Sequence, residues 1–280
     1  MKRYIRIITV GLLGFSLACQ NAPKQEKKEK SPDAQPQATL EQGDLEGSNA
    51  VMEVEGIKLY PAQIAETYPD AKLSLNSPKK EQVQEAKEYE FSFAVERYEL
   101  MQQTDDEKAQ HCANSKKGQH IHFILNNAPY EAHYEPNFKA ELMEGNNVVL
   151  AFLSRSYHES IKQKDAFILQ NFPIGDETAA FDPTAKHLFY SRPKGTYSGK
   201  DAERILLDFY LVNTSLSKEG ERVRVTIDEK EFILNSWQPY FVEGLSMGEH
   251  TFRIQLIDAN GDVVPGPFND SGQRVINLEE

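Results

Sequence analysis

The sequence predicts an all-β protein with two tandem antiparallel β-sandwich domains of the immunoglobulin-like type. One order of strand-like segments, turns and aromatic residues occurs twice, over residues 73–169 and again over 188–278. Within each copy the segments alternate apolar and polar residues with period two, as half-buried strands do. Turn residues separate the segments. Short strands at this spacing within about 100 residues are typical of a β-sandwich.

The repeat is clearest where it needs no gap. Residues 134–153 align with 237–256, and each copy reads aromatic-x-Pro-x-Phe, then a Leu, a Gly turn and a strand. Further upstream, residues 118–125 match 220–227. The sequence therefore predicts a duplicated module, because these landmarks recur in the same order.

The N-terminus has the layout of a secretory signal. Lys2 and Arg3 precede an apolar run that ends at Leu17, and this run is too short to cross a bilayer core of about 30 Å. Residues 16–19 read S-L-A-C, which resembles the lipobox of bacterial lipoproteins. The resemblance implies cleavage after residue 18 and lipidation of Cys19. An ordinary cleaved signal, with Cys19 a bystander, is the alternative.

The expected domain order follows from these features. Residues after Cys19 are rich in Gln, Lys, Glu, Pro and Ser, which is typical of a flexible tether. We expect a signal at 1–18, a lipidated and disordered tether at 19–52, a first module at 53–175 and a second at 183–280. Gln20 follows the lipidation site in place of Asp, which favours the outer membrane, facing the periplasm or the cell surface.

The charge balance excludes nucleic acid as a partner. The chain has a formal net charge of −12, and loss of Lys2, Arg3 and Arg6 with the signal takes it to −15. So acidic a protein repels nucleic acid and anionic lipid headgroups. With Cys19 lipidated, Cys112 is the single remaining cysteine and cannot form an intramolecular disulfide.

Two histidines distinguish the first module from the second. His120 and His122 are two residues apart in a predicted strand, so both point to the same face. The aligned residues of the second copy are Arg222 and Arg224. Two arginines do not sit in a dry core, so we expect this face to be wet, either facing solvent or at a module boundary. The second module folds without these histidines, which indicates a function for them.

A metal site is one interpretation of the histidines. Two same-face imidazoles on a strand can converge on one ion with bonds of about 2.0–2.1 Å. His158, just past the end of a strand, is the expected third ligand, and His133 and Cys112 are possible further ligands. Imidazole suits copper and zinc. The alternative is that the pair is ordinary polar surface.

Aromatic residues support a different binding hypothesis. Exposed tyrosine or tryptophan rings form stacking platforms for sugars or peptides. The candidates in this chain are Tyr130, Tyr134, Tyr157, Trp237 and Tyr240. For Tyr134 and Trp237, which recur at one aligned place beside a proline, a packed corner is the better explanation.

One segment resembles a group of uncharacterised bacterial exported proteins. Residues 118–130 contain G-x-H-x-H, and residues 151–160 read A-F-L-S-R-S-Y-H-E-S. Similar lipoproteins of Bacteroidota-type genomes are sometimes labelled phosphopeptide-binding, although this acidic chain lacks the Arg cluster that phosphate readers use. If the motif marks a site, the resemblance implies His120, His122, Tyr130, Arg155 and His158.

Together these observations predict a lipid-anchored envelope protein without enzymatic activity. We expect it to act as a binding or adhesion module for a protein, peptide or glycan, with Tyr130, Arg155 and Tyr157 as candidate binding residues. The alternative is a copper- or zinc-binding lipoprotein that uses His120, His122 and His158.

Overall fold

The expected all-β fold is confirmed. The computed structural model describes residues 50–62, 68–175 and 180–280, all of which belong to one compact unit. The expected signal, the lipidation site Cys19 and residues 19–49 of the tether lie outside the described residues. No helix in the described part of the chain is both long enough and apolar enough to cross a membrane.

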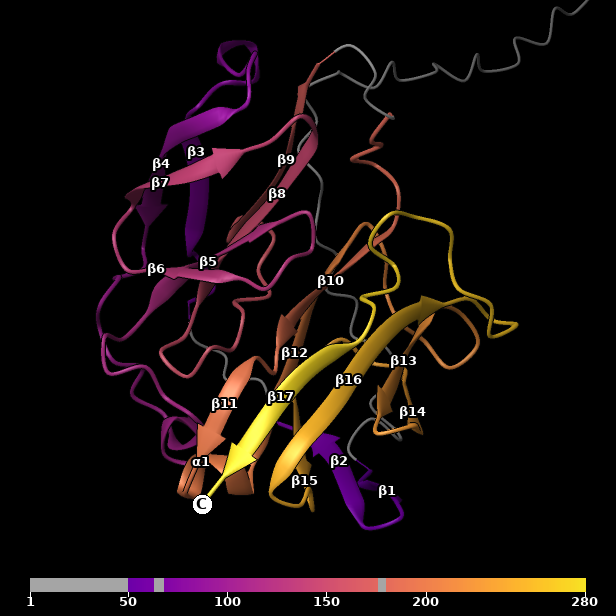
Figure 1. The fold of residues 1–280 in the computed structure, drawn as a ribbon. Coiled ribbons are helices and arrows are strands. Elements are labelled where there is room, and N and C mark those ends of the chain that lie inside the picture. The colour runs from indigo at the N-terminus through magenta and orange to yellow at the C-terminus, as the bar shows by residue number, and fades with distance from the viewer. Residues whose placement is uncertain (1–49, 63–67, 176–179) are drawn as a thin grey trace, which may run out of the picture. The chain divides into compact units, whose positions relative to one another are not determined.

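The first sandwich packs a three-stranded sheet, β3-β4-β7, against a four-stranded sheet, β6-β5-β8-β9. Figure 1 shows β8 and β9, its longest antiparallel pair, side by side. The elements are β3 (Lys72–Ser77), η1 (Lys80–Gln82), β4 (Lys87–Glu96), η2 (Glu107–Gln110), β5 (His120–Leu125), β6 (Glu131–His133), β7 (Asn137–Leu142), β8 (Gly145–Ser154) and β9 (Phe167–Ile174).

The second sandwich has the same strand order with additions at its edges. Its sheets are β1-β2-β15-β12-β10 and β11-β17-β16-β13-β14, and Figure 1 shows β16 beside β17. The elements are β10 (His187–Arg192), β11 (Gly195–Ser198), α1 (Lys200–Glu203), β12 (Ile205–Val212), β13 (Arg222–Ile227), β14 (Lys230–Leu234), β15 (Tyr240–Glu243), β16 (Gly248–Ile257) and β17 (Arg274–Glu279).

Strand pairing confirms the repeat at the level of single residues. Ile121 of β5 pairs with Leu153 of β8. The aligned residues, Val223 of β13 and Leu256 of β16, pair in the same way. The two halves are therefore copies of one fold, as the ungapped alignment predicts.

The N-terminal hairpin corrects the expected start of the first module. Strands β1 (Met52–Val54) and β2 (Ile57–Pro61) pair with each other, and β2 pairs with β15 of the second sandwich. Ile57 and Leu59 are buried in the cluster that holds the core of that sandwich. The expected boundary at residue 53 is wrong in this respect, because burial of these side chains places the hairpin with the second module.

Gly244 makes the close approach of this hairpin possible. Its φ is +87°, and a Cβ at this position would overlap the carbonyl oxygen of Gly56. We expect Gly244→Ala to lower the free energy of unfolding by about 2 kcal/mol, measured by urea denaturation. Gly248→Ala is the matched control: its φ is +122° but its Cβ position is open. An equal loss in both variants would contradict the steric explanation.

The two faces of β5 have different surroundings. Ile121 and Phe123 point into the first sandwich, where Phe123 packs edge-on against Phe91 with ring centroids 5.0 Å apart. Ile124, on the opposite face, belongs to a buried cluster that also holds residues of the second sandwich. Phe152 of β8, which pairs with His122 on the same face, stacks on Tyr210 of β12. The outer face of this sheet is therefore covered by the second half of the chain.

Candidate metal centre

His120 and His122 lie on this covered face of β5. Both side chains have 0% exposure. The period of two correctly predicts that they share a face, but the expectation of a wet face is wrong. Its cause is packing between the halves: Ser191, near the end of β10 in the second half, lies 3.2 Å from His122 Nδ1. Of the two locations expected for this face, solvent or a module boundary, the structure shows the module boundary.

His158 approaches from the loop after β8. The loop repeats residue for residue in the second copy: Arg155 N donates to Glu159 O, as Asp258 N donates to Asp262 O. At this register His158 corresponds to Gly261, and their φ angles are +71° and +91°. A residue with a side chain is disfavoured in this left-handed region. The chain thus places an imidazole where its own second copy uses glycine, which indicates a functional constraint.

The three rings converge through one nitrogen each. His120 Nε2 lies 2.9 Å from His122 Nε2 and 3.1 Å from His158 Nδ1, and the third separation, between His122 Nε2 and His158 Nδ1, is 3.4 Å. For comparison, tetrahedral coordination with bonds of about 2.0–2.1 Å separates nitrogens by about 3.3–3.4 Å. The triangle has the size of three ligand atoms around a single ion.

Hydrogen bonds at the remote nitrogens orient two of the rings. His120 Nδ1 donates to the carbonyl of Gly118 at 2.8 Å, which leaves a lone pair on Nε2 of the neutral ring. His122 Nδ1 lies 3.2 Å from the Ser191 hydroxyl oxygen, so this ring can adopt the same tautomer. Such outer partners are what fix the orientation of histidine ligands in metal sites.

Burial keeps the imidazoles neutral. It lowers the pKa of His120 from 6.5 to about 4. Burial also lowers the pKa of His122 and of His158, with neighbouring positive charge acting in the same direction. At neutral pH all three rings can therefore offer lone pairs, which a metal ligand must do.

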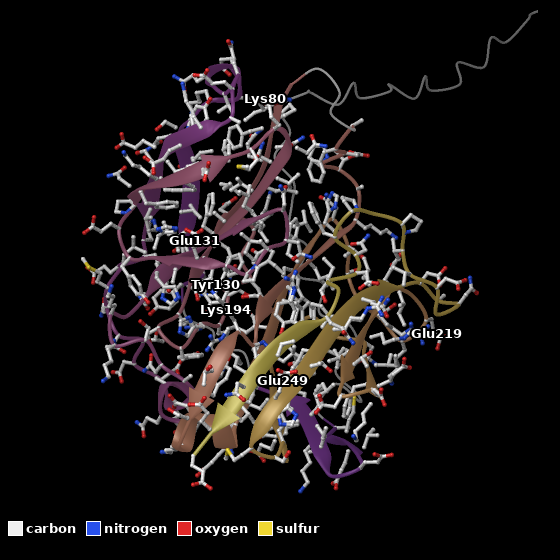
Figure 2. All side chains as sticks on the ribbon, in the orientation of Figure 1. Lys80, Tyr130, Glu131, Lys194, Glu219 and Glu249 are labelled. Atoms are coloured by element: carbon white, nitrogen blue, oxygen red, sulfur yellow. The ribbon has the colours of Figure 1, made fainter. Side chains whose placement is uncertain are left out.

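Tyr130 and two basic residues surround the triangle. The Tyr130 ring stacks on His122 with centroids 3.7 Å apart, and its hydroxyl lies 3.2 Å from His158 Nδ1. Arg192 Nη1 donates to the same hydroxyl at 2.9 Å. Lys194 Nζ lies 4.6 Å from the centroid of the Tyr130 ring, and Figure 2 labels these two residues next to each other. Nothing in the local sequence signals the contributions of Ser191, Arg192 and Lys194.

In the second copy, the equivalent strand β13 and the loop after β16 contact each other without histidine. Arg222 donates to the carbonyls of Asp258 and Ala259, and Arg224 donates to the carbonyl of Gly261. Each arginine therefore ties β13 directly to the loop after β16. In the first copy the corresponding imidazoles instead present nitrogens to one another, an arrangement that an ion between them would complete.

The possible additional ligands are not part of the triangle. His133 stacks on Phe138 with ring centroids 3.4 Å apart and pairs with Glu131. Cys112 lies in a separate apolar cluster, where burial raises the pKa of its thiol to about 12. Within the described ranges, the cluster of metal-ligating side chains is His120, His122 and His158.

The expectation of an exposed binding platform is wrong, because its candidate residues are buried. Tyr130 is 4% exposed, Arg155 2% and Tyr157 0%. Arg155 pairs with Glu159, and the Tyr157 hydroxyl donates to Asp106 at 2.8 Å, so both side chains hold the loop that presents His158. Trp237 and Tyr240 are also buried, which confirms the packed-corner interpretation for Trp237. None of these rings offers a face to a sugar or peptide.

Fold and site together define a duplicated immunoglobulin-like β-sandwich protein with a cluster of three histidines, two of them buried, at its module boundary. No family model and no curated protein matches the sequence. Among solved structures, the fibronectin type III-like modules of Clostridium thermocellum CbhA share 11% identity over 74% of this chain and 92% of that one, with a TM-score of 0.24.

Two further solved structures match this chain at similarly low identity and TM-score. The tandem V-type regions of a V-region-containing chitin-binding protein share 6% identity over 80% of this chain and 99% of that one, with a TM-score of 0.22. The Bacteroides ovatus SGBP-B protein, solved with a mixed-linkage heptasaccharide, shares 10% identity over 74% of this chain and 70% of that one, with a TM-score of 0.21. TM-scores this low carry no functional information.

Proposed function

We propose that this protein is a lipid-anchored envelope protein that binds one copper or zinc ion through His120, His122 and His158. The observation that supports it is the triangle of imidazole nitrogens, with sides of 2.9, 3.1 and 3.4 Å. Imidazole nitrogen is a preferred ligand of both metals. The lipid anchor at Cys19 and the outer-membrane location are proposals from the sequence.

The tautomer of His120 favours a ligand inside the triangle. Its Nε2 carries a lone pair aimed at the other two ring nitrogens, which either donate to it or, as the other tautomer, turn their own lone pairs inward. His120 cannot donate from Nε2 while its Nδ1 donates to Gly118. A metal ion would convert these facing nitrogens into bonds. The half-buried side chain of His158, the least enclosed of the three, gives the ion a way in.

The adhesion hypothesis receives less support than metal binding. Its candidate residues Tyr130, Arg155 and Tyr157 are all buried and hold each other or the histidine loop in place. These side chains therefore present almost no surface to a protein, peptide or glycan. We therefore propose binding of a metal ion as the primary function, and no catalytic role for the site.

Metal analysis of the mature chain tests this proposal. After incubation with Cu or Zn and removal of the excess, we expect one ion per chain by elemental analysis. His120→Asn/His122→Asn should lose it, because a single imidazole remains in the triangle. His111→Asn, which changes an exposed histidine outside the triangle, should keep it. Absence of bound metal from the wild-type protein at micromolar excess would refute the proposal.

A further inference from the structure

An uncompensated positive charge lies beside the three histidines. Arg192 is 6% exposed, and the groups that act on its charge are Tyr197, Tyr130 and Cys112 rather than carboxylates. Its Nε has no hydrogen-bond partner among the described residues. A buried guanidinium is normally paired with an acid. Here it instead donates to the Tyr130 hydroxyl, which touches His158.

Lys194 adds to the positive field. Its Nζ donates to the carbonyl of Tyr130 at 2.5 Å and lies over the face of the same ring. Burial and the nearby Arg192 lower the pKa of this ammonium group, while Glu131, an exposed carboxylate, opposes them. The charge of Arg192 and of Lys194 also lowers the pKa of His158, after burial. The site therefore holds three neutral ligands beside two cationic side chains.

We propose that this centre is selective for a monovalent ion, copper in the +1 state, over divalent zinc or copper. The proposal rests on the metal-binding function proposed above. Coulomb repulsion from Arg192 is twice as large for a doubly charged ion as for a singly charged one. The neutral imidazoles supply no negative charge to offset it. Three nitrogen donors in a triangle are sufficient ligands for Cu(I).

Competition titrations on the full mature chain test the proposal. Cu(I) affinity is measured without oxygen against a Cu(I) chelator, and Zn(II) affinity against a zinc chelator. Arg192→Met should raise Zn(II) affinity by on the order of tenfold relative to Cu(I) affinity. The lost guanidinium charge repels the doubly charged ion more strongly than the singly charged one, so its removal favours Zn(II) more. Arg222→Met, an arginine of the second copy, should leave the ratio unchanged. An unchanged ratio in Arg192→Met would overturn the proposal.

The copper reduction potential gives an independent readout. A tenfold shift in the preference for Cu(II) over Cu(I) corresponds to about 59 mV for one electron, so the potential should fall by about this amount in Arg192→Met. Lys194→Met, at a less buried site, should shift it in the same direction and serves if Arg192→Met does not fold. Tighter binding of Cu(II) than Cu(I) by the wild type would refute the inference. Failure to bind either metal refutes instead the proposed function.

Discussion

Replacing Asp208 with asparagine is expected to lower the free energy of unfolding by about 3–5 kcal/mol. Asp208 lies in β12 with 0% exposure and forms an ion pair with Lys162, whose side chain is 4% exposed. The aspartate also accepts a hydrogen bond from the Ser160 amide at 2.9 Å. Asparagine would leave the ammonium of Lys162 buried without a countercharge, which is the expensive half of breaking such a pair.

Urea denaturation of the wild type and the variant measures this loss. Glu88→Gln is the control, since it breaks the Lys139–Glu88 pair, whose side chains are 65% and 59% exposed, and should change stability by less than about 1 kcal/mol. Lys162→Met/Asp208→Asn should recover part of the loss, because it removes the unpaired charge. A loss below about 1 kcal/mol in Asp208→Asn alone would show that this buried ion pair contributes little to the stability of the fold.

The metal-free protein is expected to lose roughly 3 kcal/mol or more of stability between pH 7 and pH 4. Burial lowers the pKa of His120 from 6.5 to about 4, and the pKa of His122 and of His158 moves in the same direction. Between these values the unfolded chain binds more protons than the folded one, so stability falls as the pH falls. The stabilisation is fully present above pH 6.5.

Urea denaturation with a chelator present, at several pH values from 7 to 4, measures this dependence. A variant with all three histidines replaced by glutamine should show a flatter profile, because glutamine does not titrate. The Asp270 carboxyl, whose pKa Arg253 holds at about 2, titrates below this range. Equal slopes in the variant and the wild type would mean that other groups cause the acid sensitivity.

Much of the fold could be predicted because the chain carries two copies of one pattern. The pair Ile121–Leu153 and its equivalent Val223–Leu256 follow from an alignment without gaps and from period two. The N-terminal hairpin could not be placed in this way. Its partner strand β15 is about 180 residues away along the chain, and no local pattern specifies a long-range strand pairing.

The three histidines that come together could be predicted from the sequence, but their surroundings could not. Arginines at the two aligned positions of the second copy suggested a wet face for His120 and His122 as well. Arg222 and Arg224 are indeed partly exposed. The inference fails because the two copies have the same strand pairing within their sheets but different packing on the outer face. In the first copy, Ser191 and Arg192 of the second half pack over the histidines. A signal for His158 was present, since continuing the ungapped register five residues past Leu256 aligns it with Gly261.

The pairing of β2 with β15 determines where mechanical load enters the molecule. A pull on the segment before Met52 acts first on the edge of the second sandwich, since the hairpin is attached there. Strands β3 to β9 belong to other sheets than the one that the hairpin extends. His120, His122 and His158 are all carried by the first sandwich, so tension on the N-terminal segment does not act on them first.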